Sequence, residues 1–250
     1  MQDKRVALVT GANKGIGLQI AKDLVKRGLI VLVGSRNIQN GEAAAKAVGN
    51  DAHAIQLDVT NQASIAAAAE HIRKEFGRLD VLVNNAGIAY GGKPGVPFEE
   101  RMKTNIPSVS PLDNIRNVFE TNVFGTIAVT QAMLPLLRES PAGRIVNMGS
   151  SSGSLTLNAD PTYGHRRMFG AAYSPSKTAV HAISLAFAIE LEKTNIKVNI
   201  ACPGFTATDL NNFRGTRTVE QGAREAVRLA LIGPDGPTGT FSDEAGQVPW

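Results

Sequence analysis

The sequence has very few of the residues that build disulfide frameworks and metal sites. Its 250 residues include one cysteine, Cys202, and four histidines. A single cysteine excludes an internal disulfide and is typical of a reducing compartment, so we expect a cytoplasmic protein. Histidine and cysteine side chains this few and this scattered argue against a metal site.

Long apolar runs and blocks of like charge are also missing. No stretch of about 18 apolar residues occurs, and the first residues have no signal-peptide layout, so we expect no membrane segment. The net charge is +4 and the pI about 9.3, but the lysines and arginines are dispersed. We therefore expect a solvated basic surface and no nucleic-acid binding.

What is present is a globular composition, 43% hydrophobic and 19% charged, with apolar, β-branched runs that alternate with segments of helical period. The predicted strands lie at 5–10, 29–34, 53–58, 79–84, 144–149, 197–202 and 239–243, and the predicted helices at 15–27, 61–76, 113–138, 173–193 and from about Val219. Strands that are apolar throughout are typical of a parallel sheet covered on both faces. The pattern predicts one α/β domain over residues 1–250, a doubly wound, Rossmann-like sheet with ligands at the carboxyl ends of its strands.

The first predicted strand leads into TGANKGIG at 10–17, in which Gly11, Gly15 and Gly17 form a GxxxGxG pattern. Glycine lets the backbone turn tightly and approach a pyrophosphate, and the N–H groups at the start of the next helix favour phosphate. The turn therefore predicts a dinucleotide site, with a tight turn that holds no ligand as the alternative.

The end of the second predicted strand reads GSRN, with Arg36 and no carboxylate, and Lys14 lies inside the glycine-rich turn. An NAD site places Asp or Glu in this region for the ribose 2′-hydroxyl, whereas an NADP site uses Arg. The two cations favour NADP(H); the alternative is that they are ordinary surface residues.

Six motifs follow one another between residues 10 and 209: TGANKGIG, NNAG at 84–87, Asn122 in ETNVFGT, Ser150, YSPSK at 173–177 and PGFTATD at 203–209. In this set the chain resembles the short-chain dehydrogenase/reductase family, in its short single-domain type. Its NKGIG and Arg36 features are similar to those of NADPH-dependent carbonyl reductases.

The resemblance implies a set of residues that bind the cofactor along the carboxyl edge of the sheet. They are Gly11, Asn13, Lys14, Gly15, Ile16, Gly17, Arg36, Asp58, Val59, Asn85, Ala86, Gly87, Tyr173, Lys177, Pro203, Gly204, Thr206 and Thr208. Turn or cap chemistry is the alternative for these positions, above all for Asp58 and Thr208.

The resemblance also implies the catalytic residues Asn122, Ser150, Tyr173 and Lys177. Tyr173 would act as general acid in reduction and general base in oxidation. Lys177 lies four residues on, so in a helix it shares a face with Tyr173; we expect its ammonium to lower the pKa of Tyr173 and to hydrogen-bond the nicotinamide ribose. Ser150 would steady the substrate oxygen, although Ser151 and Ser152 compete with it as turn residues. In the family, an asparagine at the position of Asn122 kinks its helix and holds a water.

A second tyrosine, Tyr163, also has a cation four residues later, Arg167, but Pro161, Gly164 and Gly170 argue against a helix there. We interpret it as part of a loop excursion at about 154–171, which with a second excursion at about 91–111 would wall the substrate site. Met168, Phe169 and Phe205 lie among these walls and suggest an apolar substrate. Loop residues that pack among themselves are the alternative.

These features predict an NADPH-dependent carbonyl reductase that acts on a ketone or aldehyde, with the same residues able to oxidise a secondary alcohol in reverse. The alternative is a nucleotide-sensing regulator that keeps the fold without turnover. Many members of the family associate through the helices at 113–138 and 173–193, whose outer faces we expect to carry small residues such as Ala128 and Ala182. We therefore expect a homodimer or homotetramer.

Overall fold

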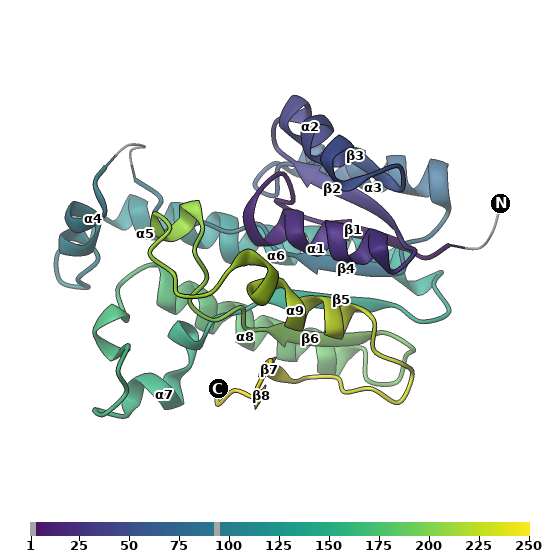
Figure 1. Cartoon of the computed structure of the whole chain (residues 1–250). Coiled ribbons are helices and arrows are strands. Elements are labelled where there is room, and N and C mark those ends of the chain that lie inside the picture. Colours follow the sequence, from purple (N-terminus) through teal and green to yellow (C-terminus); the bar gives the residue numbers. More distant parts are fainter. Residues whose placement is uncertain (1–3, 93–95) are drawn as a thin grey trace.

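The sheet brings the carboxyl ends of its parallel strands to one edge. In the computed structural model, which describes residues 4–92 and 96–250, the strand order is β3-β2-β1-β4-β5-β6-β7-β8 (Figure 1). The strands are β1 Val6–Val9, β2 Ile30–Ser35, β3 Ala52–Gln56, β4 Val81–Asn84, β5 Arg144–Met148, β6 Lys197–Ala201, β7 Phe241–Asp243 and β8 Gly246–Gln247. β1 to β7 pair in parallel, and β8 is antiparallel to β7. The strand order reverses between β1 and β4, where open α/β sheets bind ligands.

Helices cover both faces of this sheet. α1 (Gly15–Lys26), α2 (Ile38–Val48) and α9 (Val219–Ala230) pack into one apolar cluster, and α3 (Gln62–Phe76), α6 (Gly125–Arg138) and α8 (Tyr173–Glu190) into another. The shorter segments are α4 Phe98–Thr104, α5 Leu112–Phe119, η1 Glu120–Phe124, η2 Ser151–Gly153, α7 Leu155–Ala159, η3 Arg166–Met168 and η4 Asp209–Asn211. The predicted doubly wound α/β fold is confirmed. Among the described residues, no helix combines the length and apolar character needed to cross a bilayer.

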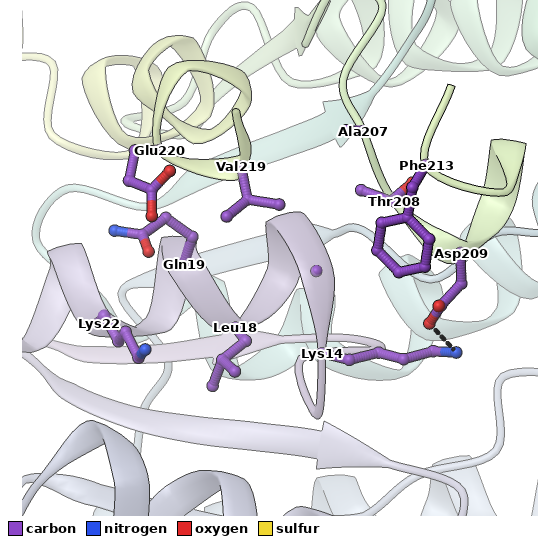
Figure 2. Close-up of a pocket in the computed structure, with 11 residues that line it drawn as sticks. Lys14, Leu18, Gln19, Lys22, Ala207, Thr208, Asp209, Phe213, Val219 and Glu220 are labelled. Atoms are coloured by element: carbon purple, nitrogen blue, oxygen red, sulfur yellow. Dashed lines mark ion pairs between the residues drawn. The ribbon is translucent and has the colours of Figure 1, made fainter. Parts of the chain in front are cut away.

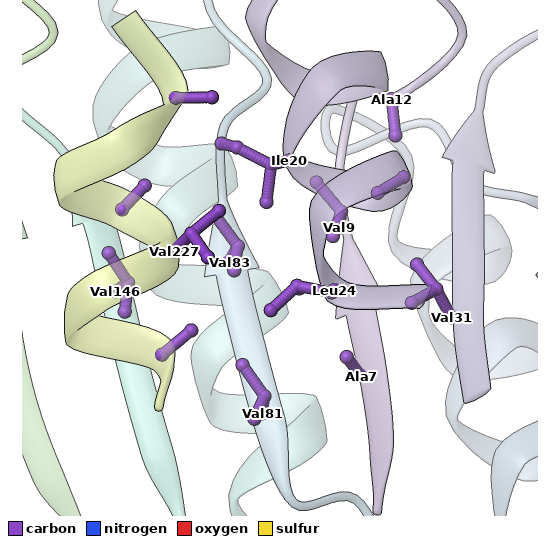
Figure 3. Packing of buried hydrophobic residues seen from close by; sticks show 14 of the residues in the cluster. Ala7, Val9, Ala12, Ile20, Leu24, Val31, Val81, Val83, Val146 and Val227 are labelled. Atoms are coloured by element: carbon purple, nitrogen blue, oxygen red, sulfur yellow. The ribbon is translucent and has the colours of Figure 1, made fainter. Parts of the chain in front are cut away.

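Successive apolar residues of the central strands enter opposite clusters. On β1, Ala7 and Val9 pack beneath α1 and α9, while Val6 and Leu8 belong to the cluster of α3 and α6. Figure 3 shows the first cluster between the strands and the helices α1 and α9. Apolar residues are needed on both sides of every central strand, which explains the unbroken apolar runs. Each fully buried Val or Leu stabilises the fold by about 1.5–3 kcal/mol relative to an exposed one.

Four helical segments differ from the prediction, and one of them is α7, which lies within the predicted loop excursion at 154–171. α2 is absent from the predicted elements, although Asn37 begins it by accepting the N–H of Asn40 at 2.9 Å. α4 lies within the excursion at 91–111, where we expected no helix; residues 93–95 of that excursion lie outside the described residues. The helix expected over 113–138 is divided by the π-helical turn η1.

A buried carboxylate joins the first and fourth strands at their amino ends. Asp80 is 1% exposed. It accepts the N–H of Val6 at 2.8 Å, the hydroxyl of Ser140 at 2.6 Å and the guanidinium N–H of Arg78 at 3.2 Å. Because a buried carboxylate is stable only with such donors, these bonds fix where β1, β4 and the end of α6 meet.

We predict that Asp80→Ala lowers the free energy of unfolding by about 3 kcal/mol, because the Val6 N–H and the Ser140 hydroxyl lose a buried acceptor. Urea denaturation followed by circular dichroism measures the change. The matched control is Asp51→Ala, which breaks the exposed Lys4–Asp51 pair of 2.8 Å and should cost at most about 0.5 kcal/mol. Equal losses in the two variants would contradict the assignment.

Candidate functional site

The motifs identified in the sequence follow adjacent parallel strands. β1 leads into the glycine-rich turn, β4 into NNAG, β5 into Ser150 and β6 into PGFTATD. The loops that leave these strands therefore lie side by side at one edge of the sheet. This is the edge at which the fold is expected to bind its ligands.

The glycine-rich turn is held against the NNAG loop. Gly11 and Gly15 have φ values of 61° and 58°, in the left-handed region that favours glycine. The Asn85 side chain donates to the carbonyl oxygens of Thr10 and Gly11 at 2.9 and 3.1 Å. A Cβ on Gly17 would lie 2.7 Å from the Gly11 oxygen, so this position has room for hydrogen alone.

The same turn fits a dinucleotide pyrophosphate. α1 begins at Gly15, and its preceding residue, Lys14, makes no side-chain cap, so the N–H groups of the first turn of α1 remain available. The positive end of the helix dipole lies at this turn, and together with the N–H groups it favours a phosphate there. Ile16 is half-buried against the core beneath, and Asn13 is half-buried in the turn itself.

The two cations that favour NADP(H) have different surroundings. Arg36 is exposed and directly follows β2. Lys14 forms an ion pair of 2.6 Å with Asp209 of η4, and the two side chains are 64% and 50% exposed (Figure 2). Exposed pairs of this kind stabilise little. Lys14 thus has a carboxylate partner in the loop after β6, which the sequence did not reveal.

A cavity of about 280 Å³ lies beside this ion pair, between α1 and the loop that leads to α9 (Figure 2). Leu18 and Gln19 line it from α1, and Thr208 and Phe213 line it from the loop. None of the four candidate catalytic residues contributes to it. The cavity therefore adjoins the glycine-rich turn rather than the predicted catalytic residues.

Several other candidate cofactor residues make turn or cap contacts. Asp58 accepts the N–H and the hydroxyl of Thr60 at 3.0 and 2.7 Å. Thr208 caps η4 in a capping box with Asn211. The turn and cap contacts of the alternative interpretation are therefore present at Asp58 and Thr208.

The remaining candidates lie along the same edge. Thr206 is buried and donates to the Pro203 oxygen at 3.0 Å. Gly204 follows in the same loop with a φ of 68°. Val59 is buried after β3, Ala86 packs against the core, and Gly87 is close enough to Asn122 that a Cβ there would lie 3.3 Å from the Asn122 Oδ1.

Tyr173 begins α8, and Pro175 lies in the first turn, as predicted. One turn later, the Lys177 Nζ lies 5.7 Å from the centroid of the Tyr173 ring. It donates a hydrogen bond of 2.7 Å to the carbonyl oxygen of Met148, the last residue of β5. The helix therefore presents both side chains to the end of β5.

Ser150 stands between that strand and α8. It precedes η2, and its hydroxyl lies 2.8 Å from the Ser152 hydroxyl and hydrogen-bonds Tyr173. η2 packs closely on α8, because a Cβ on Gly153 would lie 2.8 Å from the backbone carbonyl carbon of Lys177. Of the three adjacent serines, Ser150 is the one whose side chain meets Tyr173.

Asn122 occupies the π-helical turn η1 and is 1% exposed. Its Oδ1 accepts the N–H of Ile88 at 2.8 Å, and its Nδ2 donates to the Ile88 oxygen and to the Ser176 hydroxyl, both at 2.9 Å. The π-helical turn lies at the place where the resemblance implies a kink. Asn122 thereby connects the loop after β4 to α8.

Burial dominates the electrostatics of this group. It raises the pKa of Tyr173 to about 12, and the hydrogen bond with Ser150 opposes the rise. Burial also lowers the pKa of Lys177 to about 8. The expectation that Lys177 lowers the pKa of Tyr173 is therefore wrong for the free protein, in which the Lys177 amine is directed at the Met148 oxygen.

The Tyr163 excursion contains no α-helix through 163–167, as predicted. The ring of Tyr163 instead packs edge-on against His165, with centroids 5.7 Å apart, and His165 lies 6.4 Å from Phe205 of the loop after β6. Met168 is 38% exposed, and Phe169 is half-buried. The excursion therefore reaches the loop that follows β6.

Two residues of the site were missed from the sequence although they lie inside its motifs. The Thr10 hydroxyl accepts the N–H groups of Asn85 and Ala86 at 3.0 and 2.9 Å. Ser176, inside YSPSK, is the partner of Asn122. Both are hydroxyl residues within sequence motifs, Thr10 in TGANKGIG and Ser176 in YSPSK. Only the other residues of these motifs had been assigned a role.

Comparison with known proteins places this geometry in a family. A family model described as short chain dehydrogenase matches residues 5–218. A short-chain dehydrogenase of Penicillium roqueforti, anuI, is 37% identical over 239 residues, which cover 92% of this chain and 90% of that protein. Human carbonyl reductase [NADPH] 1 is 33% identical over 287 residues and 98% of each chain.

Two solved structures share the fold over nearly the whole chain. Salutaridine reductase from Papaver somniferum aligns with a TM-score of 0.80 and 31% identity, over 95% of this chain and 99% of that one. A 3-ketoacyl-(acyl-carrier-protein) reductase from Brucella melitensis, complexed with NADH, aligns with a TM-score of 0.77 and 27% identity, over 96% of each chain.

We predict that Tyr173 stays protonated in the free protein far above the ordinary range of tyrosine. With a pKa of about 12, less than about one tenth of it is ionised at pH 11. The difference in tyrosinate absorbance between the wild type and Tyr173→Phe measures this fraction. Because the folded pKa is raised, Tyr173 destabilises the fold progressively as the pH rises from about 10 to about 12. A midpoint near 10 would contradict the burial of this phenol.

Proposed function

Because the chain belongs to the short-chain dehydrogenase/reductase family of nicotinamide-dependent oxidoreductases, we propose that it is an NADPH-dependent carbonyl reductase. The observation that carries the proposal is the meeting of Ser150, Tyr173 and Lys177 at the end of β5. Its substrates are ketones or aldehydes, and in reverse it oxidises a secondary alcohol.

The residues that would hold the cofactor lie along the carboxyl edge, from Arg36 to the end of β5. Arg36 would bind the 2′-phosphate, and the N–H groups at the start of α1 would bind the pyrophosphate. Lys14 would be a second cation for the 2′-phosphate. Lys177 would hydrogen-bond the nicotinamide ribose. When bound, NADPH supplies the hydride that adds to the carbonyl carbon.

The proton comes from Tyr173. As the carbonyl oxygen becomes an alkoxide, it takes the proton of the Tyr173 hydroxyl, which is fully protonated at neutral pH. Ser150 donates a second hydrogen bond to the same oxygen and stabilises its developing charge. Asn122 acts through Ser176 and the loop after β4, to which it is bonded, and holds α8 in place.

The substrate site is walled by the two excursions and by the loop after β6. Exposed apolar side chains gather on these segments: Ile106, Val109, Leu155, Met168, Leu210 and Phe213. Ala171 at the end of one excursion donates to the Asn105 oxygen of the other at 2.8 Å, so the two walls are joined. An apolar carbonyl compound fits this surface best.

The enzyme acts in the cytoplasm as a homodimer or homotetramer. The outer face of α8 supports association, because Ala182, Leu185 and Ile189 are exposed on it, the last two by 39% and 60%. Ala128, which we expected on an outer face, is half-buried against the core. Ala128 keeps part of its surface accessible, so α6 remains in the proposed contact together with α8.

Turnover of NADPH with a panel of aromatic ketones, aldehydes and quinones tests the proposed reaction. We predict that Tyr173→Phe lowers kcat/KM by about 10²–10⁴-fold, the usual loss on removing a general acid. Tyr163→Phe removes a tyrosine hydroxyl from the wall of the proposed substrate site, so it should act on KM and leave kcat nearly unchanged. Full activity of Tyr173→Phe would refute the mechanism. If NADPH binds but no compound is reduced, a nucleotide-sensing regulator is the better interpretation.

We predict that Arg36→Ser raises the KM for NADPH by about 10–100-fold, because a charge-assisted hydrogen bond to the 2′-phosphate is lost. The KM for NADH should be unchanged. Arg138→Ser is the matched control, since Arg138 is exposed at the end of α6, next to the amino end of β4. A better kcat/KM with NADH than with NADPH in the wild type would overturn the cofactor assignment.

A further inference from the structure

One face of α8 holds the segment that carries Ser150. Lys177 donates to the Met148 oxygen, and the Thr178 hydroxyl donates to the Gly153 oxygen at 2.7 Å. One turn after Lys177, the Nε2 of His181 accepts the backbone N–H of Ser150 at 3.3 Å. Ser150 is thus bound to α8 through its backbone as well as through its side chain.

His181 is enclosed and fits its position closely. It is 3% exposed, and its ring lies 4.2 Å from the ring of Phe241 on β7 and 6.3 Å from that of Trp250, centroid to centroid. A Cβ on Gly149 would lie 2.8 Å from Nε2. Any side chain on Gly149 would therefore collide with the imidazole of His181.

Trp250 is in turn fastened to the chain that follows Ser150. Its backbone oxygen accepts the N–H of Thr156 at 2.7 Å and the Ser154 hydroxyl at 3.1 Å. The rings of Phe241 and Trp250 lie 5.9 Å apart. We call His181, Phe241 and Trp250 the ring cluster. It is bonded to both ends of the segment 150–156.

We propose that His181 is a positioning residue for Ser150: its Nε2 fixes the backbone of Ser150, and thereby the direction of the hydroxyl that meets Tyr173 and the substrate oxygen, while Phe241 and Trp250 hold the imidazole in place. The inference rests on the proposed function, in which Ser150 contacts the substrate. His181 is not one of the predicted catalytic residues, which are Asn122, Ser150, Tyr173 and Lys177.

The charge state of the imidazole agrees with this role. Burial, with the nearby ammonium of Lys177, lowers the pKa of His181 to about 4. The ring is therefore neutral at physiological pH, with its proton on Nδ1 and a free lone pair on Nε2 to accept the Ser150 N–H. A misplaced hydroxyl loses most of its value, because hydrogen bonds to a developing charge depend steeply on geometry.

Two substitutions of His181 distinguish its role as a hydrogen-bond acceptor from the packing of its ring. His181→Phe keeps an aromatic ring in the cluster and removes the acceptor, whereas His181→Gln removes the ring and retains an oxygen that can reach the Ser150 N–H. We expect kcat to fall about tenfold or more in His181→Phe and to be largely retained in His181→Gln, with NADPH affinity unchanged in both. His71→Phe, on the exposed face of α3, is the control for the effect of replacing a histidine by phenylalanine.

The Ser150 amide provides a readout that needs no turnover. Hydrogen exchange measured by NMR should speed up at least tenfold at Ser150 in His181→Phe and not in His181→Gln. The Gly149 amide, which donates to the Ala201 oxygen at 2.9 Å, is the internal reference and should not change. Unchanged exchange at Ser150 in a folded His181→Phe would overturn the inference.

A double-mutant cycle with Ser150→Ala distinguishes positioning from general damage. If His181 acts through Ser150, His181→Phe should reduce kcat no further in the Ser150→Ala background. Additive losses, or a larger loss in His181→Gln than in His181→Phe, would show that the ring only packs, and would overturn the inference. If His181→Phe does not fold, Trp250→Ala enters the same cycle with the same expectation. Full activity of Ser150→Ala would instead refute the proposed function.

Discussion

The close contact between α8 and the chain leaving β5 is the constraint on which the site depends. Ser150 and Tyr173 are separated by an excursion that contains no long helix, so sequence proximity does not bring them together. Contact is imposed at Gly153, where any side chain would collide with the backbone of α8, and at Lys177, which reaches back to the Met148 oxygen. Because both anchors lie on the rigid sheet-and-helix frame, the excursion between them is free to vary with the substrate.

A chain of buried polar side chains stands behind this contact. Asn84 and Asn147 are paired residues of β4 and β5, and the Asn84 amide donates to Asn147 at 2.8 Å. Asn147 donates to Ser184 of α8 at 2.7 Å, and Asn84 also donates to Thr130 of α6 at 3.0 Å. Apolar residues would fill this volume at lower desolvation cost. The polar chain instead fixes the axial position of α8, since a shift by one residue would leave several buried groups without partners.

Most strands and helices and the glycine-rich turn could be predicted from the sequence, because each of them depends on a short local pattern of residues. Unbroken apolar runs require burial on both faces, and glycines mark the turn that approaches a phosphate. α2 was missed, although Asn37 and the alanines that follow gave a signal. Asn122 could be assigned from the resemblance but not from helix propensity, which disfavours it; its partners, Ile88 and Ser176, come from distant segments. The Lys14–Asp209 pair and the bond between His181 and Ser150 depend on the same long-range packing, and no local pattern encodes them.

The direction of the pKa shift of Tyr173 cannot be predicted from neighbouring charges alone, because burial dominates it. A lysine four residues on suggests a lowered pKa, yet enclosure of the phenol raises it to about 12. The phenol is therefore held in its protonated form, the form that the proposed general acid would need. Oxidation needs the phenolate, and each unit by which the pKa exceeds the ambient pH costs about 1.4 kcal/mol. The Lys177 amine can offset this cost only by leaving the Met148 oxygen for a position nearer the hydroxyl. A protonated Tyr173 is the state that the proposed reduction would use, whereas the proposed oxidation would first have to meet the cost of ionising this buried phenol.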